Sequence, residues 1–104
     1  MAKTNLFNEC NDLEQIIHNL KTGKEACCIV DKRHSLDDVI EYLQGFLDEL
    51  KDLNDEIHEK GNTSEMLKKV HDKYSELWLF QVDYYIDSLP KVIGGLWRYP
   101  DCDK

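Results

Sequence analysis

The chain has 104 residues and a formal net charge of -8, with 21 acidic against 13 basic side chains. This length suits a single hydrophobic core, and we expect one domain over residues 1–104 with a short C-terminal tail at 94–104. The composition is 41% hydrophobic and 33% charged with 2 prolines, which is typical of a folded, helix-rich protein rather than a disordered one. The acidic balance opposes direct binding to nucleic acid or to an anionic membrane, and it favours a basic protein partner.

The N-terminal residues carry no apolar stretch of signal-peptide length, and no segment approaches the length that spans a bilayer. We therefore expect a cytoplasmic protein. The four cysteines are Cys10, Cys27, Cys28 and Cys102, and none of their spacings is the repeated CxxC of a zinc site. Reduced thiols are predicted, with no metal and no cofactor.

The first predicted element is a helix from about residue 6 to residue 20, followed by Gly23 as a stop signal. One face of this helix carries Leu6, Cys10, Leu13, Ile17 and Leu20. In the segment 24–34 the apolar run from Ala26 to Val30 is too short to distinguish a helical turn from a strand. We favour a short helix, because no second convincing strand is evident and a strand would need a partner chain or an edge contact.

The clearest predicted element is a helix from Leu36 to Lys60. Ser35 with Asp38 resembles a capping box, and Gly61 is suited to end the helix. Nine apolar residues fall on one side of it: Leu36, Val39, Ile40, Leu43, Phe46, Leu47, Leu50, Leu53 and Ile57. Gly45 is the weak point, either costing about 1 kcal/mol relative to alanine or allowing a neighbouring backbone to come close.

A third long helix is predicted to begin after Thr63 or Ser64 and to run without a breaker to Pro90. Its amphipathic pattern is lost in ELWLFQVDYY, residues 76–85, where a strand is the alternative because of the aromatic and β-branched content. The helix is favoured because residues 64–76 offer no turn. Pro90 then starts a short helical turn that Gly94 and Gly95 break, and Trp97 packs from a loop against the end of the bundle.

The predicted fold class is therefore all-α, a bundle of three main helices plus one or two short ones with up-and-down connectivity. The residues expected in its core are Leu13, Ile17, Leu20, Ile40, Leu43, Leu47, Leu50, Val70, Tyr74 and Leu77.

The helix predicted at 36–60 carries nine acidic residues against Lys51 and Lys60. Five of the nine form one stripe opposite the apolar face: Glu41, Asp48, Asp52, Asp55 and Glu59. Like charges three or four residues apart on a helix cost about 0.2–0.5 kcal/mol per pair. Such a stripe is either a solvated face or a docking surface for a basic protein, where it would imitate a nucleic acid backbone.

Aromatic side chains offer anchors for the same kind of contact, since interface hot spots favour Trp and Tyr. For Trp78 taken alone core packing is favoured over a role as an anchor, while Tyr84 and Tyr85 lie beside Asp83 and Asp87. The DYY at residues 83–85 together with the acidic helix is locally similar to the immunity proteins of nuclease bacteriocins. In those proteins such features engage a basic toxin domain, and the likeness covers these features alone.

The function that we favour is a small non-enzymatic inhibitor that masks a basic, nucleic-acid-handling protein, in the manner of immunity proteins or phage anti-defence proteins. The predicted partner-binding residues are Glu41, Asp48, Asp52, Asp55, Glu56, Glu59, Trp78, Tyr84 and Tyr85. One alternative is a homodimeric structural or assembly protein that self-associates through residues 77–86.

A magnesium-dependent hydrolase is the third possibility, with Glu56 and Glu59 and, one turn apart on the third helix, Asp83 and Asp87 as ligands. It is disfavoured because Glu56 and Glu59 lie opposite the apolar face and the second pair has the wrong spacing. No evident pair of a nucleophile and a base accompanies them, so we expect no catalysis.

Overall fold

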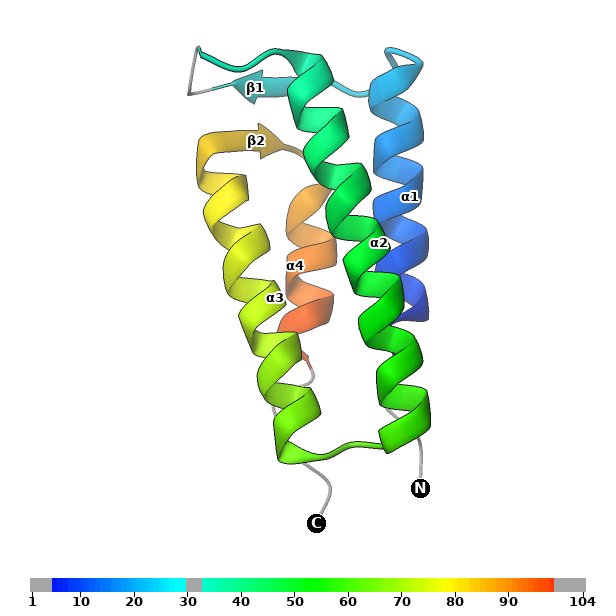
Figure 1. The fold of residues 1–104 in the computed structure, drawn as a ribbon. Coiled ribbons are helices and arrows are strands. Elements are labelled where there is room, and N and C mark those ends of the chain that lie inside the picture. The colour runs from blue at the N-terminus through cyan, green and yellow to red at the C-terminus, as the bar shows by residue number, and fades with distance from the viewer. Residues whose placement is uncertain (1–4, 30–32, 99–104) are drawn as a thin grey trace.

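The computed structural model of the protein describes residues 5–29 and 33–98 (Figure 1). Its elements, in chain order, are α1 (Phe7–Lys21), β1 (Cys27–Ile29), α2 (Leu36–Lys60), α3 (Ser64–Asp83), β2 (Tyr84–Ile86) and α4 (Leu89–Trp97). The helices run side by side as a bundle, and the two short strands lie together at one end of it. The predicted all-α class is confirmed, with a small sheet added.

Helix α2 has the bounds that its sequence predicts, because its ends are fixed by local chemistry. The Ser35 hydroxyl accepts a hydrogen bond from the Asp38 amide at 3.3 Å, and the Asp38 carboxylate accepts one from the Ser35 amide at 3.1 Å. At the other end Gly61 has a φ of 81°, a conformation that favours glycine. A Cβ added at Gly45 would meet nothing within 4 Å, so this glycine serves no close backbone approach.

The third helix ends at Asp83, so the prediction of one helix up to Pro90 is wrong. Residues 84–86 form β2, which pairs antiparallel with β1 in the register Cys27 to Ile86, Cys28 to Tyr85 and Ile29 to Tyr84. The short helix favoured for segment 24–34 is wrong for the same reason. The inward-facing backbone groups of each strand pair with the other strand, and neither segment signals this distant pairing locally.

Helix α4 continues through Gly94 and Gly95, which were expected to break it. Its buried side chains Leu89, Val92, Ile93 and Leu96 pack into the bundle, and this burial outweighs the poor helix propensity of glycine. Trp97, predicted in a loop, is the last residue of α4 and lies with its ring 4.9 Å from Tyr74 and 5.2 Å from His71. The rest of the tail, residues 99–104 with Cys102, lies outside the described residues.

The core runs through the middle of the bundle and draws on every helix. All the predicted core residues are buried except Ile40 and Tyr74, which are half-buried and pack against the core. Within the described part of the chain, no helix combines the length and the apolar character that a membrane span requires.

Candidate functional site

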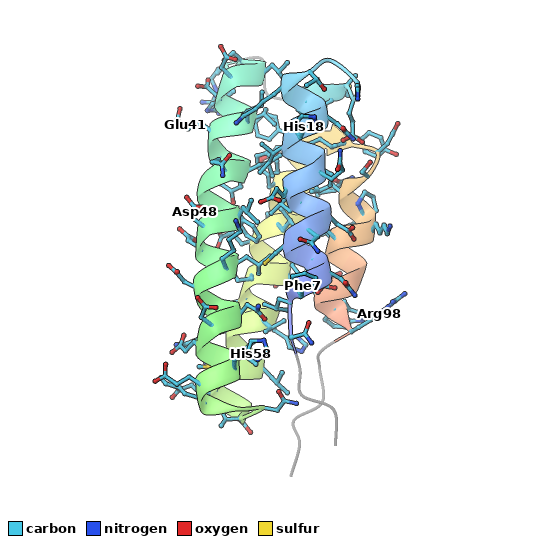
Figure 2. The ribbon with its side chains drawn as sticks, turned by 90° about the vertical axis from the view of Figure 1, so that its right-hand side faces the viewer. Phe7, His18, Glu41, Asp48, His58 and Arg98 are labelled. Carbon is cyan, nitrogen blue, oxygen red and sulfur yellow. The ribbon has the colours of Figure 1, made fainter. Side chains whose placement is uncertain are left out.

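Five exposed carboxylates lie in one line along the outer side of α2. They are Glu41, Asp48, Asp52, Asp55 and Glu59, and we call them the acid row. Figure 2 labels two of them, Glu41 and Asp48, which project away from α1 and α4. At about 1.5 Å of rise per residue the row extends about 27 Å. No member has an ion pair or hydrogen bond with another described residue.

Glu56, which was also predicted to bind the partner, is held differently from the acid row. Its carboxylate accepts hydrogen bonds from Lys60 at 2.9 Å and from Lys69 at 3.0 Å. These hydrogen bonds, first from Lys60 and then from Lys69, hold the pKa of Glu56 below its usual value. Lys60 is visible in the sequence as a neighbour four residues on, but Lys69 comes from α3. Glu56 therefore belongs to the contact between the two helices.

A groove runs between α2 and α3, which lie side by side in Figure 1. It consists of three overlapping hollows of about 360, 500 and 390 Å³, and we call it the α2–α3 groove. Eight carboxylates line it, against two lysines, Lys69 and Lys73. The carboxylates are Asp38, Glu41, Glu49, Asp52, Glu56, Asp72, Glu76 and Asp83.

Three of these carboxylates, Asp72, Glu76 and Asp83, come from α3, and they were not among the predicted partner-binding residues. Their spacing of four and then seven residues places them on one side of a helix, so a signal was present. What the sequence lacks is the orientation of α3, which turns that side toward α2. Because Glu41 and Asp52 belong to both features, the acid row forms one edge of the α2–α3 groove.

Lys73 spans the middle of the α2–α3 groove. Its ammonium group pairs with Glu49 of α2 and lies 3.5 Å from the Glu76 carboxylate and 5.2 Å from the centre of the Phe46 ring. Burial alone would lower the pKa of Lys73, but the hydrogen bond to Glu49 and the charge of Glu76 outweigh it, so the pKa is raised. This lysine stays charged and neutralises part of the groove from within.

The aromatic residues predicted as anchors divide into exposed and buried groups. Trp78 is 49% exposed, so core packing is wrong for it, and Tyr85 is also exposed. Tyr84 is only 8% exposed and packs on Phe80, with the ring centres 4.7 Å apart. Successive residues of a strand point to opposite sides, and this separates the two tyrosines. Tyr84 therefore stabilises the interior and presents little surface to a partner.

An uncharged surface follows the outer face of α3 into β2. It consists of the exposed residues Trp78, Leu79, Val82 and Tyr85, and we call it the apolar stripe. Leu79 is the most exposed of them at 65% and also lines the α2–α3 groove, so the two surfaces adjoin. The excess of apolar residues in ELWLFQVDYY is thus divided between the core, at Leu77 and Phe80, and the surface.

Among the described residues no group of three or more His, Cys, Asp or Glu side chains is arranged to hold a metal ion. Asp83 and Asp87 were expected one turn apart on a helix, which is wrong, because α3 ends at Asp83 and β2 separates the two. Cys10 is a buried free thiol, and burial raises its pKa to about 11. Cys27 and Cys28 are also free thiols in β1, and burial raises the pKa of Cys27.

The acid row, the α2–α3 groove and the apolar stripe together make up the candidate site. Comparison of the chain with protein-family models, with curated proteins and with solved structures finds no match.

Proposed function

We propose that the protein is a non-enzymatic inhibitor that binds and masks a basic, nucleic-acid-handling protein through the acid row and the α2–α3 groove. One observation carries the proposal. Five exposed carboxylates without ion-pair partners among the described residues lie along α2, and two of them, Glu41 and Asp52, are among the eight carboxylates that line the α2–α3 groove.

A cationic partner would gain from this arrangement in two ways. The field of the acid row attracts a basic surface from a distance and raises the association rate. Binding then relieves the repulsion between like charges on neighbouring turns of α2. A length of about 27 Å matches about eight base pairs of DNA at 3.4 Å each, so the row suits a cationic groove built for nucleic acid.

Affinity beyond this steering needs contacts that exclude water. Trp78 and Tyr85 of the apolar stripe are large, exposed and partly polar, which is the character of interface hot spots. They lie next to the α2–α3 groove through Leu79. A partner seated along the acid row would therefore reach apolar anchors at the end of the groove near β2.

The proposal is tested by reversing part of the acid row with Asp52→Lys, Asp55→Lys and Glu59→Lys in one variant. A matched control reverses three acids outside the acid row, with Asp12→Lys, Glu65→Lys and Asp87→Lys. Both variants change the net charge from -8 to -2. Each is immobilised and used to capture proteins from a cell lysate, with circular dichroism to verify folding.

We expect basic nucleic-acid-binding proteins to be retained by the unmodified protein and by the control, to be lost from the acid-row variant, and to be released by duplex DNA. Equal capture by the acid-row variant would contradict the proposal. If both variants lost the captured proteins equally, capture would depend only on the net charge of the protein. That outcome would also contradict the proposal.

The apolar stripe favours a second candidate, a homodimer that uses this surface itself. Its four residues are uncharged, so two acidic copies could meet there with little repulsion. Light scattering after size exclusion would then give about 24 kDa, twice the 12.2 kDa of the chain. Leu79→Asp should restore the monomer, while Phe7→Asp, on the exposed side of α1, should not. A monomeric unmodified protein would exclude this candidate.

A further inference from the structure

The hollow at the β2 end of the α2–α3 groove has a chemical character of its own. Its volume is about 360 Å³, and it lies between the first turns of α2 and the last turns of α3. The exposed apolar side chains that line it are Tyr42 and Leu79, and the buried Val39, Phe80 and Tyr84 lie behind them. Its polar groups come from His34, Asp38, Glu76 and Asp83. The hollow therefore combines aromatic side chains with carboxylates.

The aromatic walls are held in place by one another. The rings of Tyr42 and Phe80 are stacked with their centres 4.3 Å apart and their planes 4° from parallel. The Phe80 ring in turn packs on Tyr84, and His34 meets the edge of Tyr84 at 5.8 Å. Since contacts across two helices fix these rings, the hollow exists before any ligand arrives.

The carboxylates of the hollow are only partly satisfied. Glu76 accepts a hydrogen bond from the Tyr42 hydroxyl at 3.3 Å and shares Lys73 with Glu49. Asp38 accepts the hydrogen bond of the α2 cap. Asp83 is exposed and has no ion pair or hydrogen bond with another described residue. Burial raises the pKa of Tyr42 to about 12, so its hydroxyl remains a hydrogen-bond donor to Glu76.

We propose that this hollow binds an arginine side chain presented by the basic partner, a step that rests on the proposed function. Three carboxylates line the hollow with His34, and of the three only Glu76 has an ion pair among the described residues, with Lys73 outside the hollow, so the lining favours a cation. A guanidinium group is flat, so it lies along an aromatic ring and offers paired donors to carboxylates, whereas an ammonium group acts as a point charge. The position of Lys73 over Phe46 already places a cation on a ring of the same groove.

The test compares two fluorescent peptides, of eight arginines and of eight lysines, by anisotropy in 150 mM salt. We expect the arginine peptide to bind about fivefold more tightly to the unmodified protein, as a desolvated stacking contact implies. Asp83→Asn and Tyr42→Leu, measured separately, should each reduce this preference toward unity. Because Asp83 is exposed, Asp83→Asn should remain folded. It therefore still tests the site if Tyr42→Leu unfolds the protein.

Asp48→Asn is the matched control, because it removes one charge from the acid row at a position outside the hollow. It should weaken both peptides alike and leave their ratio unchanged. Equal binding of the two peptides, absence of arginine-peptide binding, or a preference that survives Asp83→Asn would overturn the arginine site. The proposed function depends instead on the acid-row variant and its lysate capture, so the two proposals fail separately.

Discussion

Neutralising the middle of the acid row should make the protein more stable. Asp52 is exposed on α2 and has four acidic neighbours at three or four residues, Asp48, Glu49, Asp55 and Glu56. Asp52→Asn removes the charge at nearly constant helix propensity and volume. We expect the variant to have a higher free energy of unfolding at low ionic strength, because its loss of charge relieves repulsion along the helix.

The size of this gain in stability depends on the like-charge pairs that no lysine neutralises. Glu49 and Glu56 are neutralised in part by Lys73 and by Lys60 and Lys69, so the pairs with Asp48 and Asp55 dominate. Two such pairs at about 0.2–0.5 kcal/mol each, plus a smaller contribution from the other two, give about 1 kcal/mol. For a domain of this size that corresponds to a rise in Tm of about 4–8 °C.

The assay is thermal and urea unfolding followed by circular dichroism at 10 mM and at 1 M NaCl. The gain should disappear at 1 M, where the screening length is about 3 Å. Glu49→Gln is the control one turn away, and it should not stabilise, because it removes the ion pair with Lys73. If Asp52→Asn were neutral or destabilising at 10 mM, or if its gain persisted at 1 M, the repulsive acid row would be refuted.

Three further predictions concern the stability of the bundle. Gly94→Ala should add about 0.5–1 kcal/mol of stability, because a Cβ at this position meets nothing within 4 Å. Gly95→Ala should instead destabilise the protein, because its Cβ would lie 3.1 Å from the Glu9 Cγ and displace that side chain. Paired thermal melts decide this, and equal Tm changes would contradict it. Leu43→Ala should cost about 2–5 kcal/mol in urea unfolding, since Leu43 is fully buried, and a loss below about 1 kcal/mol would be inconsistent with this packing. Folding raises the pKa of the Cys10 thiol from 9.0 to about 11, so the stability due to the neutral thiol is full below pH 9 and is lost as the pH rises through about 11. Cys10→Ala should therefore lose less stability than the unmodified protein between pH 8 and pH 10.5, and equal losses would exclude this role.

The features predicted correctly depend on residues that lie within a few positions of one another in the chain. The cap at Ser35, the apolar face of α2 and the stop at Gly61 act over single turns, and together they fix the helix bounds. The acid row is visible for the same reason, because its members share a helix whose period is known. Trp78 and Tyr85 were identified as surface candidates, although only the structure places them outside the core.

The features that were missed depend on which segments meet. Strands of three residues carry no periodic signal, so the pairing of β1 with β2 and the end of α3 at Asp83 could not be read locally. The orientation of α3 relative to α2 supplies Lys69 to Glu56 and turns Asp72, Glu76 and Asp83 into the groove.

The sequence by itself determined the helical class, the bounds of α2 and the acid row, because local hydrogen bonding and helical periodicity are enough to specify them. Only the tertiary structure decided which charges are neutralised, which of the two tyrosines is buried and where aromatic rings and carboxylates converge in one hollow. These depend on packing between residues far apart in the chain, whose contacts form only when the whole bundle excludes water.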